Sequence, residues 1–279
     1  MSDTVTGTAA GVPFTALAPA VPLEGPAPLV VTWHMIDAPR TDAAFAAALP
    51  MAGVPAWRVH LGMPLCGPRM VDGRMDAVLE RARRDSVLAY LSPFVEQAVT
   101  EFPAALAELR ERLPLDSGPI GVVGGSLGGA VALRVLAERR VPVAAAALVN
   151  PAIRARSVVD LLEEIIGEPY EWNDESRHAA DQLDFVARAD EIAAGHPQPP
   201  LLLVSGELDI PALRTDAKAL VGALRDRYTT PEHLELVTVP GLGHPLADEP
   251  GLAPAPQLPL AKAVDEAMIE WFLRHLTPQ

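Results

Sequence analysis

Residues 124–129 read Gly-Gly-Ser-Leu-Gly-Gly and place Ser126 at the centre of a G-x-S-x-G pattern. The apolar run 120–123 precedes this pattern and a helix-like stretch follows it, so the sequence predicts a strand, a tight turn and a helix. Small neighbours in such a turn let strand and helix pack closely while the serine hydroxyl stands above the sheet. Ser126 is therefore the candidate nucleophile. The alternative is a turn that only packs tightly or binds phosphate at the helix N-terminus.

A nucleophilic serine needs a base that removes its proton, and His244 is the best placed histidine for this role. It lies in the loop GLGHPLADEP, after a β-like run and before the last long helix. The loop is expected at the carboxyl end of the sheet; the alternative is an ordinary surface histidine. The remaining histidines fit less well, in a predicted strand, a helix or a connection: His34, His60, His178, His196, His233 and His275.

The base in turn needs a carboxylate that fixes its tautomer. The segment LLLVSGELDIPAL predicts a buried strand that ends in Ser-Gly and then presents Glu207 and Asp209 in a turn before a helix. Asp209 is the preferred acid and Glu207 the fallback. The alternative role for Asp209 is to cap the helix that begins near Pro211.

These residues are positioned by an alternation of short apolar runs and amphipathic stretches, which is typical of a mostly parallel sheet with helices on both faces. The expected strands are 29–33, 56–61, 120–123, 143–148, 201–204 and 234–239. The expected helices are 42–51, 85–113, 126–139, 211–228 and 260–276. Residues 1–27 are expected to form an arm or an irregular edge strand near 12–17, followed by one domain over 28–279.

The stretch 151–199 interrupts this rhythm, because it replaces one crossover but has room for two helices, near 158–166 and 175–194. We expect it to form a small cap above the carboxyl ends of the strands, where ligand contacts are usually built. Tyr170 and Trp172 are its candidate substrate-binding residues. The alternative is an ordinary helical crossover that packs on the sheet.

Taken together, the GGSLGG, GELD and GLGH segments resemble the α/β-hydrolase superfamily, nearest to dienelactone hydrolase-like and prolyl-oligopeptidase-like esterases, over roughly residues 28–276. The chain order Ser126, Asp209, His244 is the one expected for this fold. The resemblance implies an acyl-enzyme mechanism on a carboxylester, or on a thioester or small amide, without a metal or organic cofactor. The alternatives are a non-catalytic ligand-binding protein, or an acyltransferase or cofactor-free haloperoxidase that uses the same triad.

The loop after the first central strand departs from the pattern of these relatives. They often carry His-Gly there, whereas this chain has Trp33-His34-Met35-Ile36. The backbone amide of Leu127, with that of Ile36 or else Met35, is expected to form the oxyanion hole. The bulky Met35 side chain is a candidate pocket residue, and His34 is expected to be a structural hydrogen-bonding group under the loop.

The composition narrows the class of partner and the location. A formal charge of −14 without clustered Lys and Arg disfavours nucleic acid, and a small-molecule ester is the expected partner. The start of the chain lacks a basic and apolar leader, and its apolar runs are too short to span a bilayer, so a cytoplasmic location is expected. The single cysteine, Cys66, excludes an internal disulfide and is expected to be a buried or loop thiol.

Overall fold

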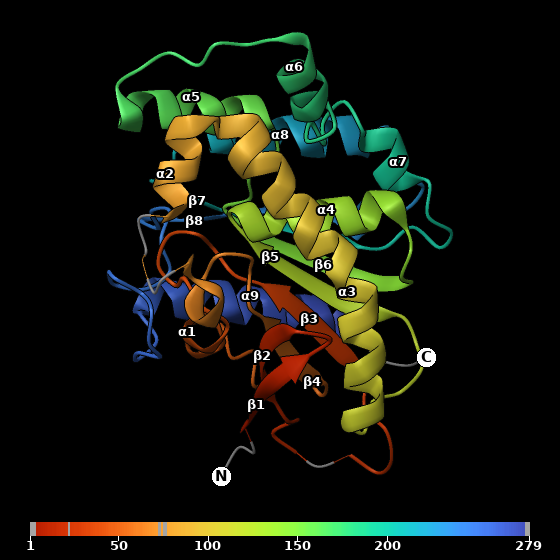
Figure 1. Cartoon of the computed structure of the whole chain (residues 1–279). Helices are drawn as coiled ribbons and strands as arrows, with labels where there is room; N and C mark the ends of the chain where they lie inside the picture. Colours follow the sequence, from red (N-terminus) through yellow and green to blue (C-terminus); the bar gives the residue numbers. More distant parts are fainter. Residues whose placement is uncertain (1–3, 22, 72–73, 75–76, 277–279) are drawn as a thin grey trace.

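The computed structural model describes residues 4–21, 23–71, 74 and 77–276, and its centre is a mixed sheet (Figure 1). Among the described residues, eight strands pair in the order β1-β2-β4-β3-β5-β6-β7-β8. They are β1 Thr4–Ala9, β2 Val12–Leu17, β3 Leu29–Trp33, β4 Trp57–Leu61, β5 Ile120–Gly125, β6 Val143–Val149, β7 Leu201–Gly206 and β8 Leu234–Val239. Strands β3 to β8 are parallel to one another, and β2 is antiparallel to both of its neighbours, β1 and β4. The expected mostly parallel α/β sheet is confirmed.

Helices cover both faces of this sheet. The α-helices are α1 Asp42–Ala48, α2 Ala77–Arg84, α3 Ser92–Arg112, α4 Leu127–Glu138, α5 Ala155–Ile166, α6 Asp174–Asp181, α7 Ala189–Ala193, α8 Pro211–Arg225 and α9 Pro259–His275. A π-helical segment, η3 Ser86–Leu91, joins α2 to α3, and short 3-10 turns occur at η1 Gly67–Arg69 and η4 Pro231–His233.

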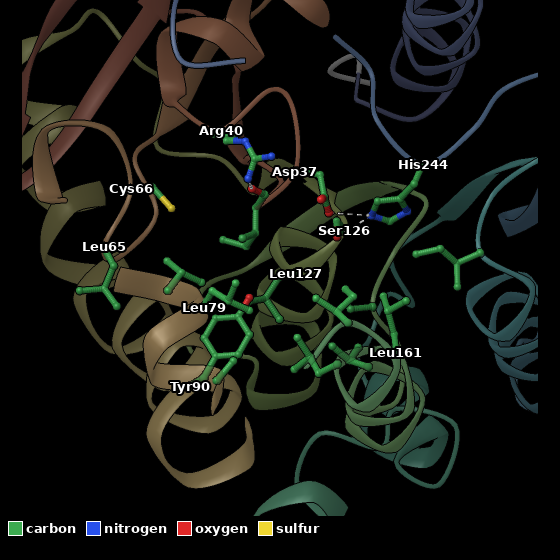
Figure 2. Close-up of a pocket in the computed structure, with 18 of the residues that line it drawn as sticks. Asp37, Arg40, Leu65, Cys66, Leu79, Tyr90, Ser126, Leu127, Leu161 and His244 are labelled. Carbon is green, nitrogen blue, oxygen red and sulfur yellow. Dashed lines mark hydrogen bonds and ion pairs between the residues drawn. The ribbon is translucent and has the colours of Figure 1, made fainter. Parts of the chain in front are cut away.

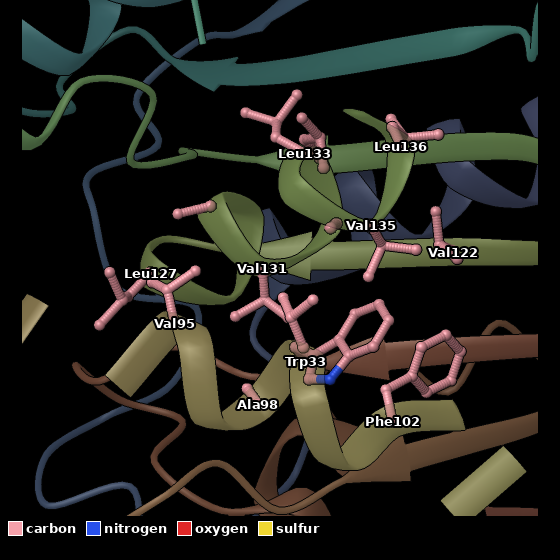
Figure 3. Close-up of a cluster of buried hydrophobic side chains, with 14 of the residues drawn as sticks. Trp33, Val95, Ala98, Phe102, Val122, Leu127, Val131, Leu133, Val135 and Leu136 are labelled. Carbon is pink, nitrogen blue, oxygen red and sulfur yellow. The ribbon is translucent and has the colours of Figure 1, made fainter. Parts of the chain in front are cut away.

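Two apolar layers hold the helices to the sheet because successive side chains of a strand point to opposite faces. Val31 packs in the layer that includes α3, α4 and α8, whereas its neighbour Val30 packs in the layer that includes α1 and α9. In the first layer Trp33 meets Phe102 of α3 edge-on, with ring centroids 4.9 Å apart (Figure 3). Burial on both faces explains why these strands are continuous apolar runs.

The strands expected at 29–33 and 234–239 agree with β3 and β8, and the other four expected strands agree to within two residues at each end. The long helix expected over 85–113 is divided into η3 and α3, with Pro93 in the first turn of α3. Helix α2 was not predicted, because its sequence AVLERARR is short and half of its residues are charged.

The N-terminal segment departs from its expectation. Residues 12–17 form a strand, but β2 lies between β1 and β4, so the edge of the sheet is β1. The register pairs Ala9 with Val12, which closes a tight hairpin at Ala10 and Gly11. The sequence TVTGTA of β1 has few large apolar residues and alternates exposed with half-buried positions, as suits an edge strand.

Residues 151–199 contain α5, α6 and α7, whereas two helices were expected there. Helix α5 lies with α2 at one end of the molecule (Figure 1). Helix α7 packs against α4 and α8, as an ordinary crossover helix does. The part of the chain that the structure describes has no helix with both the length and the apolar character needed to cross a bilayer.

Candidate active site

Ser126 lies in the turn between β5 and α4 and has a strained backbone. Its φ of 48° and ψ of −120° are rarely adopted by residues other than glycine. The surrounding glycines allow this turn: a Cβ atom on Gly124 would lie 2.3 Å from the carbonyl oxygen of Gly128, and one on Gly128 would lie 2.2 Å from that of Trp33. Because side chains there would collide with backbone, the paired glycines are required by packing, and the serine stands at the carboxyl end of the sheet.

Three side chains from separate loops form a hydrogen-bonded chain. His244 Nε2 lies 2.9 Å from Ser126 Oγ, and His244 Nδ1 lies 2.6 Å from Asp209 Oδ1. Asp209 is almost completely buried and can hold the Nδ1 proton, which leaves Nε2 to accept the serine proton. The structure therefore brings together the predicted nucleophile, base and acid.

The two candidate acids have different surroundings. Asp209 follows β7, accepts the amide proton of Ile210 at 2.7 Å, and faces His244. The exposed Glu207 instead accepts the amide proton of Gly241 at 2.9 Å. The N-cap of α8 is Ile210, without a capping side chain, so Asp209 does not have the alternative capping role. This geometry favours Asp209 as the partner of the histidine.

The backbone after β3 is held by His34. Its Nδ1 donates to the carbonyl oxygen of Met35 at 2.6 Å, and its Nε2 accepts the amide proton of Met63 at 3.0 Å. Burial lowers the pKa of His34 to about 4, so the ring is neutral and can make both bonds. The Met35 carbonyl and the Ile36 N–H belong to one trans peptide and point in opposite directions. Holding the carbonyl under the loop thus turns the Ile36 N–H away from His34.

Ile36 and Leu127 both line the cavity above Ser126. Leu127 is the first residue of α4, so its N–H has no carbonyl partner within the helix. The side chain of Met35, a predicted pocket residue, is instead completely buried in the layer that includes α1 and α9. A Cβ on Gly125 would lie 2.8 Å from Met35 Cγ, so the methionine packs beneath the nucleophile turn. The prediction that Met35 is a pocket residue is therefore wrong.

Asp37, the next residue of this loop, also faces the histidine. Its Oδ2 atom lies 3.4 Å from His244 Nε2, and the interaction with His244 lowers the pKa of Asp37. Burial lowers the pKa of His244, but hydrogen bonds and charges from Asp209 and Asp37 outweigh it and raise this pKa to about 9. The imidazole therefore lies between two carboxylates, with Asp209 near Nδ1 and Asp37 near Nε2.

Arg40 fixes the loop that carries Ile36 and Asp37. Its guanidinium donates to the carbonyl oxygens of Ile36 at 2.7 Å and Pro250 at 3.0 Å, and to both carboxylate oxygens of Glu249 at 2.7 and 2.8 Å. The backbone supports this connection, because Arg40 N–H donates to the carbonyl of Gly251 at 2.7 Å. The loop after β3 is thereby joined to the loop that follows His244.

Asn150, at the end of β6, connects two further loops. Its Nδ2 donates to the carbonyls of Gly243 and His244 at 2.8 and 3.0 Å, and its Oδ1 accepts the amide proton of Gly206 at 2.8 Å. The residue is completely buried and has a φ of 44°, a conformation that Asn tolerates better than most residues. The sequence did not predict three of these site residues, Asn150, Asp37 and Arg40. The one signal in the sequence was the pair Asn150-Pro151 directly after a buried strand, which concerns Asn150 alone.

An apolar cavity of about 500 Å³ opens above Ser126. Figure 2 shows Asp37 and Arg40 on one side of the serine and Leu79, Tyr90 and Leu161 on the other. The apolar walls come from α2 and η3, which supply Val78, Leu79 and Tyr90, and from α5, which supplies Val158, Leu161, Leu162 and Ile165. Cys66, also in the lining, is buried, and burial raises the pKa of its thiol to about 12.

Tyr170 and Trp172 do not have the predicted position in the cavity. Tyr170 lines a neighbouring polar hollow and donates its hydroxyl proton to Asp85 at 2.7 Å. The ring of Trp172 meets the ring of Tyr170 edge to face, with centroids 4.9 Å apart, and the Arg156 guanidinium lies over the Trp172 ring at 4.7 Å from its centre. Their contacts are with Asp85 and Arg156, and neither residue lines the cavity above Ser126. We therefore do not assign them to substrate binding.

A mostly parallel sheet, a strained serine turn and the chain order Ser126, Asp209, His244 identify the α/β-hydrolase class. A profile of the prolyl oligopeptidase family matches residues 96–278. The match covers more than half of the chain and includes the serine, aspartate and histidine loops. The chain belongs to the prolyl oligopeptidase family and is a serine hydrolase of the α/β-hydrolase fold.

Solved structures share this fold. TT1662 from Thermus thermophilus is 20% identical, with a TM-score of 0.68 and full coverage of both chains. Carboxyl esterase 2 from Tuber melanosporum is 19% identical, with a TM-score of 0.59 over 98% of this chain and 85% of that one. Dienelactone hydrolase from Anabaena variabilis is 16% identical, with a TM-score of 0.56 over 99% and 98%. No match was found among curated protein sequences.

Proposed function

We propose that this chain hydrolyses carboxylic esters through Ser126, His244 and Asp209. The observation that carries the proposal is the hydrogen-bonded chain of these residues, with contacts of 2.9 and 2.6 Å, beside a largely apolar cavity. Acyl transfer to a serine requires a nucleophile that is hydrogen-bonded to a base, and a base that is hydrogen-bonded to an orienting acid. Two structural relatives carry the names carboxyl esterase and dienelactone hydrolase, which are in line with it.

In the proposed mechanism, Ser126 Oγ attacks the ester carbonyl while its proton moves to His244 Nε2. The backbone amides of Leu127 and Ile36 stabilise the oxyanion that develops. His244 then gives the proton to the departing alcohol, which leaves an acyl group on Ser126. A water molecule, deprotonated by the same imidazole, hydrolyses this acyl-enzyme and restores the serine.

The cavity supports an apolar acyl group as the preferred one. Leucine, isoleucine and valine side chains from α2 and α5 face each other across it, and they can remove an acyl chain from water. A thioester or a small amide would react by the same steps. A short peptide is the competing substrate, since the family name includes oligopeptidases.

The test is a fluorophosphonate labelling assay followed by a series of p-nitrophenyl esters of increasing acyl length and a prolyl anilide. We expect labelling at Ser126 and turnover of the esters well above that of the anilide. Ser126→Ala should abolish both labelling and turnover, with a loss on the order of 10⁶ in kcat. Ser92→Ala, at the start of α3, is the matched control and should behave like the wild type.

Other outcomes would redirect the proposal. Efficient anilide cleavage with poor ester turnover would make the protein a peptidase. Labelling without hydrolysis of any substrate would indicate an acyltransferase or a haloperoxidase that uses the same groups. An unlabelled but folded protein would indicate a non-catalytic ligand-binding member of the fold.

A further inference from the structure

The wall of the cavity beside the nucleophile contains an unusual carboxylate. Most lining side chains are apolar, whereas Asp37 carries a negative charge within 3.4 Å of the catalytic imidazole. Its side chain is 52% exposed and is therefore accessible from the cavity mouth. A carboxylate here opposes the negative charge that develops on the carbonyl oxygen, so by itself it disfavours ester cleavage.

Arg40, a second charged side chain of the lining, acts on Asp37 through its charge but makes no ion pair with it among the described residues. Arg40 is occupied by Glu249, which accepts from it with both carboxylate oxygens, and by two backbone carbonyls. Among the described residues, His244 is the one basic side chain within ion-pair distance of Asp37. Arg40 balances the charge of Glu249, and a protonated His244 balances that of the buried Asp209, which leaves Asp37 as the excess negative charge at the mouth.

The position of Asp37 indicates which part of a substrate it meets. His244 Nε2 protonates the departing alcohol in serine hydrolases, so a group next to Nε2 borders the space of the alcohol. Figure 2 shows Asp37 on the side of Ser126 opposite Leu79, Tyr90 and Leu161. With the acyl chain among those apolar residues, the alcohol portion lies against Asp37.

We propose that Asp37 is a specificity-determining residue that favours esters with a cationic alcohol portion, such as amino-alcohol esters, combined with an apolar acyl chain. This rests on the proposed ester hydrolysis and adds the chemistry of the leaving group. A cation close to Asp37 offsets the unfavourable charge beside the oxyanion and competes with His244 for the carboxylate. The imidazole is then free to accept the serine proton.

The experiment compares two butyrate esters of nearly equal shape, that of choline and that of the uncharged 3,3-dimethylbutanol. We expect wild-type kcat/KM to favour the choline ester by about fivefold or more at low salt, and less as salt screens the interaction. Asp37→Asn should reduce this ratio to about one, while Asp37→Glu should retain a preference for the cation. Because any change in His244 affects both esters, the ratio isolates recognition of the charge.

Asp226→Asn is the matched control, since it removes one negative charge from an exposed position at the end of α8. It should leave the ratio unchanged. As a second measurement, choline should inhibit wild-type hydrolysis of a neutral aryl ester more strongly than 3,3-dimethylbutanol does. That difference does not require an Asp37 variant.

A wild-type ratio near one with good turnover of both esters would overturn the role of Asp37 but leave ester hydrolysis intact. A large ratio that persists in folded Asp37→Asn would assign cation recognition to another residue and would also overturn it. Absence of labelling and turnover with every ester would refute the ester hydrolase itself and this inference with it.

Discussion

Asn150 holds the backbone of His244 from the neighbouring strand end, with its Nδ2 3.0 Å from the histidine carbonyl oxygen. The same side chain accepts the amide proton of Gly206, so one buried amide sets the distance between the histidine loop and the strand that leads to Asp209. The geometry of the imidazole and its carboxylate therefore depends on a residue that does not contact either side chain.

Asn150→Ala should reduce both stability and activity. It leaves buried backbone groups without partners, which costs about 1–3 kcal/mol in the free energy of unfolding, and it releases the His244 loop. We expect kcat/KM for an aryl ester to fall by about 100-fold, because small displacements of catalytic groups have effects of this size. Urea unfolding and steady-state kinetics measure the two quantities.

The control for this change is Asn173→Ala, which removes the N-cap of α6. It should cost about 1 kcal/mol of stability and leave kcat/KM unchanged. Equal losses of activity in the two variants would mean that Asn150 acts only through overall stability.

The two acids of the GELD segment should differ strongly in effect. Asp209→Asn removes the carboxylate that faces His244 Nδ1 and should lower kcat by roughly 10⁴. Glu207→Gln changes a surface side chain that accepts from Gly241 and should alter kcat by about twofold at most. The reverse ranking would assign the orienting role to Glu207.

The pH dependence follows from the two carboxylates around His244. The pKa of about 9 means that the imidazole is largely protonated at neutral pH, and a general base must be neutral. The kcat/KM for a neutral ester should therefore rise as pH increases through about 9. Asp37→Asn should move this rise to lower pH, because it removes one of the two charges that favour the imidazolium.

The contribution of His244 to the free energy of unfolding should fall over the pH range in which kcat/KM rises. The folded pKa of His244 is raised above its ordinary value of 6.5, so this contribution is fully present below about pH 6.5 and is lost as pH rises through about 9. Chemical unfolding of wild type and His244→Gln at a series of pH values measures it. A stability difference between the two proteins that does not vary from pH 6 to pH 10 would contradict the raised pKa.

Cavity variants should change the preference for acyl length. Leu161→Phe adds volume to the α5 wall and should shift the preferred p-nitrophenyl ester to a shorter chain, with about 1–3 kcal/mol of discrimination per excluded methylene. Tyr170→Phe removes the hydrogen bond to Asp85 outside the cavity and should leave the order of esters unchanged. A reordered series for Tyr170→Phe alone would restore a role for that residue in substrate choice.

The parallel sheet could be predicted because burial on both faces makes each strand a continuous apolar run. Ser126, Asp209 and His244 could be selected because each follows such a run at the carboxyl edge. Glycine also marked the nucleophile turn, since the close approach of Gly128 to the backbone of Trp33 excludes a side chain. These signals are local in the chain.

The parts that could not be predicted depend on contacts between distant segments. Arg40 and Glu249 are separated by more than 200 residues, and nothing near either one indicates the partner. Tyr170 and Trp172 were assigned to the pocket from residue type, but the direction of their side chains is set by Asp85 and Arg156. Helix α2 is short and half charged, so it was not predicted and one wall of the cavity was missed.

Substrate preference and catalysis can change independently in relatives of this enzyme, because different elements supply the reacting groups and the cavity walls. The reacting side chains are borne by loops at strand ends, whereas the apolar walls come from α2 and α5, two segments far apart in the chain. Substitutions in either helix can accumulate without moving Ser126, His244 or Asp209. A library confined to residues 77–84 and 155–166 would therefore explore new acyl groups on an unaltered reaction centre.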